Sequence, residues 1–204
     1  MKKFIIALLA LAAVSTVPAS AQFRRGFTAG VNYTDLRFKY DLVDVSQTVG
    51  YTAGVTGEMM FPGIGFGIDL GLLYEKMGAK INLGQKTVWS SLGYGNENVM
   101  LHYIHIPVHL RFKWTRMNGF EEKLAPFIFG GPDFTILAGH SNASAFKCAG
   151  GELGLTAGAG VELFRRWQVS ATYTWGMTYA LKTKLLDDYS ARNRAWTVRV
   201  TYLF

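Results

Sequence analysis

The chain has 204 residues, of which 50% are hydrophobic and 14% aromatic, and its formal net charge is +7 at pH 7. Its basic residues, such as Lys86, Lys147 and Arg192, are scattered over separate predicted loops, whereas a nucleic-acid-binding protein gathers its positive charge on one face. Nucleic acid is therefore excluded as the expected partner, and the single cysteine, Cys148 in a predicted loop, excludes an intramolecular disulfide.

The first 21 residues have the pattern of a secretory signal peptide. Lys2 and Lys3 precede an apolar run over Phe4–Val14, and Ala19-Ser20-Ala21 forms a small-x-small cleavage site. We expect cleavage after Ala21, which leaves residues 22–204 as a single mature domain. No later run approaches the roughly 18 apolar residues of a transmembrane helix.

The rest of the chain alternates between apolar and polar residues, a period of two that is typical of β-strands with one apolar face. The clearest pair, Leu153–Leu163 and Trp167–Thr178, forms a predicted hairpin whose strands have about 11 residues each, the length that a tilted strand needs to cross a bilayer. The eight predicted strands, in chain order, are Phe27–Tyr33, Val49–Met59, Phe66–Glu75, Met100–Trp114, Leu124–Leu137, Leu153–Leu163, Trp167–Thr178 and Trp196–Phe204.

Two of these strands carry prolines that disturb the pattern. Pro107, in the fourth strand, has no N–H to donate and predicts a bulge or weakened pairing. The fifth strand is interrupted by Pro126, Gly130, Gly131 and Pro132, so its register is not predicted.

The connections between strands alternate between short and long. Short turns follow the second, fourth and sixth strands, whereas long loops are expected at about residues 35–47, 76–97, 138–150 and 179–193. Bacterial outer-membrane barrels have an even number of strands, short periplasmic turns and long outer loops. The sequence therefore predicts an all-β fold, an eight-stranded antiparallel up-and-down transmembrane β-barrel in the outer membrane of a Gram-negative bacterium.

The composition of the two strand faces predicts which one meets lipid. The polar face is mostly Gly, Thr and Ser, which suits the narrow interior of eight strands but would make a poor surface for a secreted, lipocalin-like barrel. The aromatic residues also sort into two girdles at the expected membrane interfaces. The upper girdle is Tyr33, Tyr51, Tyr74, Trp175 and Trp196, and the lower girdle is Phe27, Phe66, Trp114, Trp167 and Phe204.

Several motifs resemble those of the PorT-like family of small outer-membrane β-barrel proteins. They are Gly50-Tyr51-Thr52-Ala53-Gly54-Val55, Leu72-Leu73-Tyr74 to Gly78-Ala79-Lys80, Tyr103 to Leu110, Pro126-Phe127 to Gly131-Pro132, Ala157 to Glu162, and Tyr202-Leu203-Phe204. The resemblance spans nearly the whole mature chain, although His105 and His109 stand where family members often have leucine. It implies an outer-membrane barrel whose terminal aromatic is read by the barrel-assembly machinery. The founding member takes part in protein secretion, a role that would carry over by fold-level analogy alone.

Charged residues on the polar face are the first candidate site. Glu58, Asp69 and Glu162 are expected in the lower lumen near Arg111, Lys113 and Arg199. Because unpaired charges in a narrow interior are costly, we expect an ion-paired plug that closes the lumen, with a proton or ion pathway as the alternative.

The histidines are the second candidate site. His105 and His109 share a face, but their backbone separation of about 13 Å is too great for one metal, so we interpret them as hydrogen-bonding residues of the lumen. His102 faces lipid near Ser90, Ser91 and Glu97, which leaves a lipid-modifying enzyme as a less favoured alternative.

The residues thus favour a non-enzymatic barrel without a cofactor, embedded in outer-membrane lipid. Two roles stay open. The outer loops could bind a protein partner, in particular the 76–97 loop with its apolar Trp89, Leu92 and Tyr94, or the barrel could be an accessory subunit of a secretion or outer-membrane complex.

Overall fold

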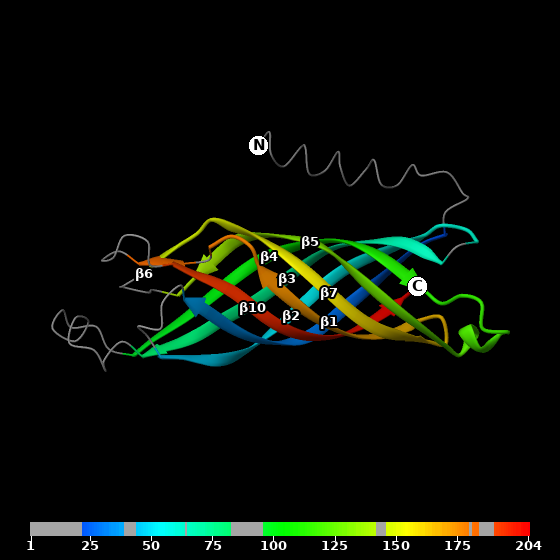
Figure 1. Ribbon diagram of the computed structural model, residues 1–204, viewed down its shortest axis with the longest axis horizontal. Helices are drawn as coiled ribbons and strands as arrows, with labels where there is room; N and C mark the ends of the chain where they lie inside the picture. The colour runs from blue at the N-terminus through cyan, green and yellow to red at the C-terminus, as the bar shows by residue number, and fades with distance from the viewer. Residues whose placement is uncertain are drawn as a thin grey trace, which may run out of the picture.

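The computed structural model describes residues 22–38, 44–63, 65–82, 96–141, 146–179, 181–183 and 190–204, which are almost entirely β-structure (Figure 1). The predicted signal peptide, residues 1–21, lies outside them. Within these segments no helix is long and apolar enough to cross a membrane. The elements are β1 (Gln22–Phe38), β2 (Asp44–Met60), β3 (Phe66–Asn82), β4 (Asn96–Lys113), the 3-10 helix η2 (Phe120–Glu122), β5 (Leu124–His140), β6 (Phe146–Cys148), β7 (Gly151–Leu163), β8 (Trp167–Gly176), β9 (Leu181–Thr183) and β10 (Ser190–Leu203).

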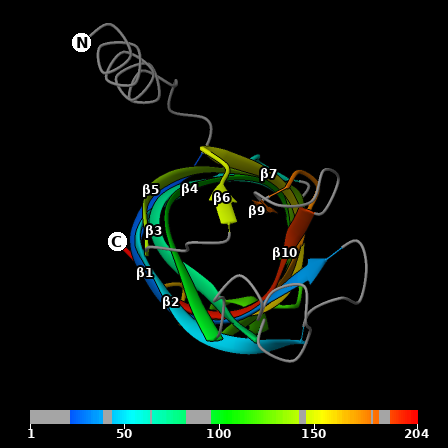
Figure 2. The same cartoon turned by 90° about the vertical axis from the view of Figure 1, so that its left-hand side faces the viewer.

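The eight long strands found in the described segments close into a barrel. Neighbours pair antiparallel in the order β1-β2-β3-β4-β5-β7-β8-β10, and β10 returns to β1 with a ladder from Gly26↔Leu203 to Phe38↔Ala191. The view along the barrel shows the closed ring (Figure 2). The predicted eight-stranded up-and-down barrel is thereby confirmed.

The strands run further toward the loop end than the sequence predicted. Parts of all four predicted loops belong to strands, since β1 reaches Phe38, β3 reaches Asn82 and β4 begins at Asn96. The physical reason is that ladder hydrogen bonds continue above the apolar band, where the outer face no longer has to be apolar and the alternation fades.

Two short strands at this end were also missed. β6 and β9 pair with each other, and β9 pairs with the start of β10. Cys148 was predicted to lie in a loop, which is wrong, because it ends β6.

Pro107 weakens the pairing of β4, as predicted. It pairs with Asp133 of β5, but the ladder then lacks pairs until Leu110↔Gly130, and a further irregularity lies at His102/Tyr103. On the other side of β4 the ladder lacks pairs between Leu70↔Val108 and Leu73↔His105, so the pairing with β3 is weakened near Pro107. The register of β5 is fixed by pairs such as Lys113↔Phe127 and Phe127↔Gly160.

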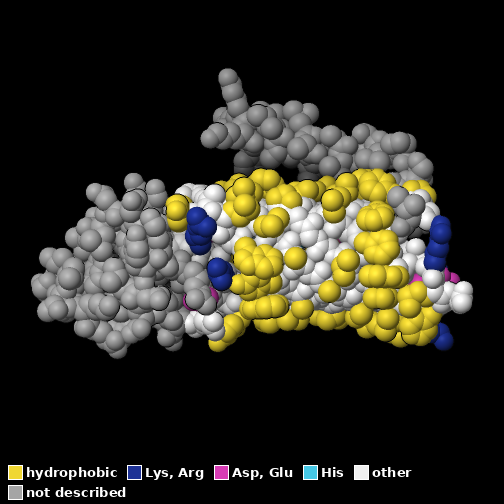
Figure 3. Space-filling view, viewed as in Figure 1, with side chains coloured by type: hydrophobic (Ala, Val, Ile, Leu, Met, Phe, Trp, Pro, Cys, Tyr) yellow, Lys and Arg dark blue, Asp and Glu magenta, His cyan; other side chains and the backbone are white. Residues whose placement is uncertain are grey.

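The outer wall is apolar. Val169 and Val198 are 38% and 50% exposed on the outside, as the lipid-facing interpretation requires. On the face seen in Figure 3, hydrophobic side chains cover the wall, and Lys and Arg lie only toward the two ends of the barrel.

Tight turns close the opposite end, where the C-terminus also lies (Figure 1). Between β7 and β8, Phe164 and Arg165 both have positive φ, 51° and 59°, and the Arg166 N–H donates to the Leu163 carbonyl at 3.1 Å. Phe164 and Arg165 are the central residues of a type I′ turn, whose twist suits the flanking strands, within a three-residue connection between Leu163 and Trp167. In the β4–β5 turn, the Glu121 carboxylate accepts hydrogen bonds from the backbone N–H of Glu121 itself and from the N–H groups of Met117 and Gly119. These hydrogen bonds lower the pKa of Glu121.

Candidate functional site: the polar lumen and the outer girdle

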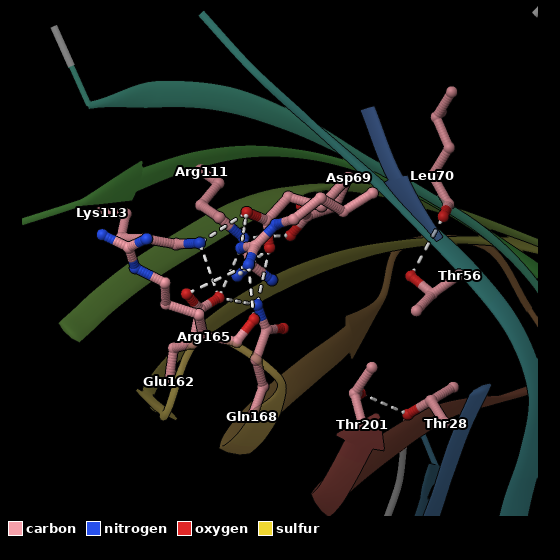
Figure 4. A network of polar contacts seen from close by, with 12 residues as sticks. Thr28, Thr56, Asp69, Leu70, Arg111, Lys113, Glu162, Arg165, Gln168 and Thr201 are labelled. Atoms are coloured by element: carbon pink, nitrogen blue, oxygen red, sulfur yellow. Dashed lines mark hydrogen bonds and ion pairs between the residues drawn. The ribbon is translucent and has the colours of Figure 1, made fainter. Parts of the chain in front are cut away.

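A cluster of ion-paired side chains crosses the lower lumen; we call it the charged layer. Glu58 of β2 is at its centre. The Glu58 carboxylate accepts hydrogen bonds from Arg24 at 2.6 Å, Lys113 at 2.5 Å, Arg111 at 3.0 Å and Gln168 at 2.6 Å. Its members are Arg24, Glu58, Asp69, Arg111, Lys113, Glu162 and Gln168. Figure 4 shows Arg111, Lys113, Glu162 and Gln168 pointing toward one another from β4, β7 and β8.

The remaining carboxylates of the charged layer complete its pairing. Glu162 accepts from Lys113 at 2.7 Å and from Arg24 at 2.5 Å, and Asp69 accepts from Arg111 Nε at 2.7 Å. The Arg111 guanidinium also lies 4.0 Å from the centre of the Phe127 ring. Three cations thus face three carboxylates, which balances the charge that the narrow interior must hold.

A second cluster lies higher in the lumen; we call it the histidine layer, and its members are Glu75, His105, His109 and Asp133. Asp133 Oδ1 lies 3.2 Å from His105 Nε2 and 2.7 Å from His109 Nε2, while His105 Nδ1 lies 2.8 Å from Glu75 Oε2. All four side chains are buried. One carboxylate therefore bridges the two imidazoles.

A small cavity adjoins the histidine layer toward the loop end. It is lined in part by His105, Asp133 and Glu152, and its volume of about 20 Å³ is room for one water molecule. The Glu152 carboxylate accepts hydrogen bonds from Tyr103 and from Asn193 Nδ2, the latter at 2.7 Å. In the described part of the chain, no group of three or more His, Cys, Asp or Glu side chains has the arrangement of a metal site.

The structure brings together five of the predicted lumen residues, Glu58, Asp69, Arg111, Lys113 and Glu162, whereas it places Arg199 elsewhere. Arg199 is buried, but among the described residues it forms no ion pair with the charged layer. Arg199 pairs across the sheet with Gly30 and Ser170, and it precedes Thr201, which is opposite Gln168, by two residues on β10. Its position on β10 therefore sets it above the layer.

The two predicted histidines also meet more closely than their backbones suggest. The separation of about 13 Å is a backbone distance, and both side chains lean toward Asp133 between them.

Sequence reasoning missed four lumen residues: Arg24, Glu75, Gln168 and Asp133. Arg24 precedes the predicted start of the first strand, and Asp133 lies in the strand whose prolines and glycines hid its register. Glu75 and Gln168 were on the predicted polar faces, so the alternation alone could have assigned them to the lumen.

The outer wall carries the predicted girdles. All ten residues are substantially exposed, from 39% for Tyr74 to 62% for Phe27. Several of the rings contact one another at a tilted angle, for example Tyr51 and Tyr74 with centres 5.9 Å apart and Phe27 and Phe204 with centres 5.6 Å apart. They form two aromatic groups on either side of the apolar wall.

The third predicted histidine lies at the upper girdle. His102 Nδ1 is 2.5 Å from the Tyr74 hydroxyl. Of the groups proposed to assist it in lipid chemistry, Ser90 and Ser91 lie outside the described residues, as does the side chain of Glu97.

Comparison with known proteins agrees with this architecture. The model of the family described as outer membrane protein beta-barrel domain matches residues 18–181, most of the chain. The fold is similar to that of OprG from Pseudomonas aeruginosa, with a TM-score of 0.53 and 13% identity over 89% of this chain and 94% of that one. No curated protein sequence is significantly similar to this chain.

Two further structures are similar at lower scores. They are Ail, the attachment invasion locus protein of Yersinia pestis (TM-score 0.42, 11% identity, 90% of this chain and 99% of that one), and the outer-membrane enzyme PagL (TM-score 0.45, 8% identity, 86% and 97%). The similarity to OprG supports the barrel fold, and the family match supports both the fold and its location in the outer membrane.

Proposed function

The chain belongs to the outer membrane protein beta-barrel domain family, and on that premise we propose that it is a non-enzymatic barrel with a closed lumen that acts through its loop end in surface interaction or envelope assembly. The observation that carries this proposal is the charged layer. Glu58 is 2% exposed and binds three cations that reach it from β1 and β4, so the lumen is filled at that level.

Passage of ions through this layer would require several ion pairs to open together. Lys113 Nζ joins Glu58 and Glu162 at 2.5 and 2.7 Å, and Arg24 joins the same two carboxylates. Breaking buried pairs exposes uncompensated charges at a cost of several kcal/mol each. A plug is therefore favoured over the alternative of a proton or ion pathway.

Conductance of the purified protein in planar lipid bilayers tests this proposal. We expect no sustained current steps, because the charged layer closes the lumen. Stable single-channel openings of the unmodified protein would contradict the plug and favour a pore.

A second candidate function is that of an accessory subunit in a secretion or outer-membrane complex, which the PorT-like motifs favour. The structural support is the edge at the loop end, where β6 extends the sheet beyond β9 and β10. A partner strand or the 76–97 loop could complete this edge. The loop's apolar residues Val88, Trp89, Leu92 and Tyr94 lie outside the described residues.

Purification in mild detergent separates the two functions. A stoichiometric membrane partner would support the accessory role, whereas a free monomer would support independent surface interaction. Deacylated or palmitoylated lipid A found only in expressing cells would contradict both and favour a lipid-modifying enzyme around His102.

A further inference from the structure

Four polar and aromatic residues gather on the outer wall at the loop end of β2, β3 and β4. Tyr51, Lys76 and His102 form one cross-strand row, since the register pairs Tyr51 with Lys76 and Lys76 with His102. Tyr74 is two residues nearer the middle of β3. We call these four residues the β2–β4 cluster, and we propose that it binds the phosphate of a lipid headgroup in the outer leaflet of the membrane.

One contact within the cluster joins two of its polar groups. The Tyr74 hydroxyl is 2.5 Å from His102 Nδ1. When this hydroxyl donates to Nδ1, the imidazole proton is on Nε2, which then becomes a donor. In the described part of the chain His102 Nε2 has no hydrogen-bond partner. It is therefore available to an acceptor such as a phosphate oxygen.

Lys76 supplies the positive charge of the cluster. Its ammonium lies 6.0 Å from the centre of the Tyr51 ring, a cation–π contact that keeps the side chain over the girdle. At the positions next to Lys76 in the sheet, which are Tyr51 and Ala53 of β2 and Met100, His102 and Ile104 of β4, there is no Asp or Glu. Two other cations on the outer surface differ in this respect, since Arg194 lies opposite Asp35 and Arg165 pairs with Glu122 at 2.8 Å.

The position of the cluster selects a lipid rather than a soluble anion. Aromatic side chains occupy the headgroup level of a membrane, and basic groups there bind anionic headgroups. Immediately below the cluster, Val55, Leu72 and Ile104 are exposed on the apolar wall at 47%, 49% and 39%. A phosphate held by Lys76 and His102 would therefore place its acyl chains along these side chains.

Lipid binding to the purified protein tests the proposal. Native mass spectrometry would compare retention of bisphosphorylated lipid A with that of the same lipid after enzymatic removal of its phosphates. We expect the phosphorylated form to bind more tightly. The Lys76→Gln/His102→Phe double variant should lose about tenfold in affinity, because a lysine near an anionic membrane surface contributes about fivefold and the neutral hydrogen bond from His102 at least about twofold. Tyr74→Phe, which removes only the hydroxyl, should give a smaller loss.

Arg25→Gln is the matched control. Arg25 is also a cation over a girdle ring, 5.9 Å from the centre of Phe204, but at the opposite end of the barrel. It should leave lipid A binding unchanged. Equal retention of the two lipids, an equal loss in Arg25→Gln, or displacement of lipid A by millimolar inorganic phosphate would each overturn the proposal. Unchanged migration of the folded variants on unheated gels would establish that they retain the barrel.

Discussion

The Glu58 carboxylate connects β2 with side chains from β1, β4 and β8. Glu58→Gln would keep the volume but leave Arg24, Arg111 and Lys113 facing only two carboxylates. Because an uncompensated buried charge is strongly destabilising, we expect the free energy of unfolding to fall by about 3–5 kcal/mol. Urea unfolding in lipid vesicles, followed by tryptophan fluorescence, would measure this change.

Glu122→Gln provides the comparison for Glu58→Gln. Glu122 pairs with Arg165 at 2.8 Å, but these side chains are 62% and 64% exposed. Exposed pairs contribute about 0–1 kcal/mol, so this variant should unfold almost like the unmodified protein. Equal effects of the two substitutions would show that burial does not set the strength of the charged layer.

Residues of the charged layer differ in how far the sequence could predict them. Glu58, Asp69 and Arg111 follow from alternation, because an even or odd position on a regular strand selects the face. The partners of each charge depend on register and side-chain reach across the lumen, which alternation does not contain. Asp133 shows this limit, since its meeting with His105 and His109 required the register of β5.

At the scale of the elements, β5 and β7 fit together through large and small residues. The register places Phe127 opposite Gly160 and Phe129 opposite Gly158. A Cβ added to Gly160 would lie 2.5 Å from the Phe127 ring and 2.5 Å from the Val169 carbonyl oxygen. Phe127 in turn supports Arg111 of the charged layer. Gly158 and Gly160 of β7 thus leave space for the rings of Phe129 and Phe127, which contact Arg111 of the charged layer.

Gly160→Val should therefore disturb both the packing between β5 and β7 and the charged layer. We expect a loss of about 1–3 kcal/mol in the free energy of unfolding, the usual cost of overpacking. The control is Ala159→Val on the neighbouring outward position, which is exposed and should be tolerated in lipid. Urea unfolding of both variants would measure the two changes in the free energy of unfolding. An equal loss in Ala159→Val would show that valine destabilises this part of β7 on either face, and that crowding in the lumen is not the cause.

The strands also show where the apolar/polar alternation stops predicting β-structure. Alternation identified all eight long strands of the described segments because the lipid imposes an apolar outer face over the membrane. Above it, β3 continues through Lys80 to Asn82 in backbone register with β4. That pairing has no side-chain signature, and the predicted loops were therefore too long.

For the whole molecule, the apolar wall and the ion-paired lumen are two results of one alternation. Each strand sends its apolar residues to lipid, so every charge within the membrane has to find its partner inside the barrel. The two polar layers then occupy different levels of a lumen only eight strands wide. If the charged layer closes the lumen as proposed, function resides at the ends of the barrel or on its wall, where the loops and the β2–β4 cluster are.

Shortening the side chains of one ion pair tests whether the charged layer closes the lumen. Glu58→Ala/Lys113→Ala removes one charge of each sign, so the layer stays neutral while space opens at its centre. We expect current steps in planar bilayers that the unmodified protein does not produce. Glu122→Ala/Arg165→Ala, which removes a pair at the exposed turns, should stay silent. If the lumen double variant also stays silent, the histidine layer must be sufficient to close the barrel, because it is the next level at which buried side chains meet across the lumen.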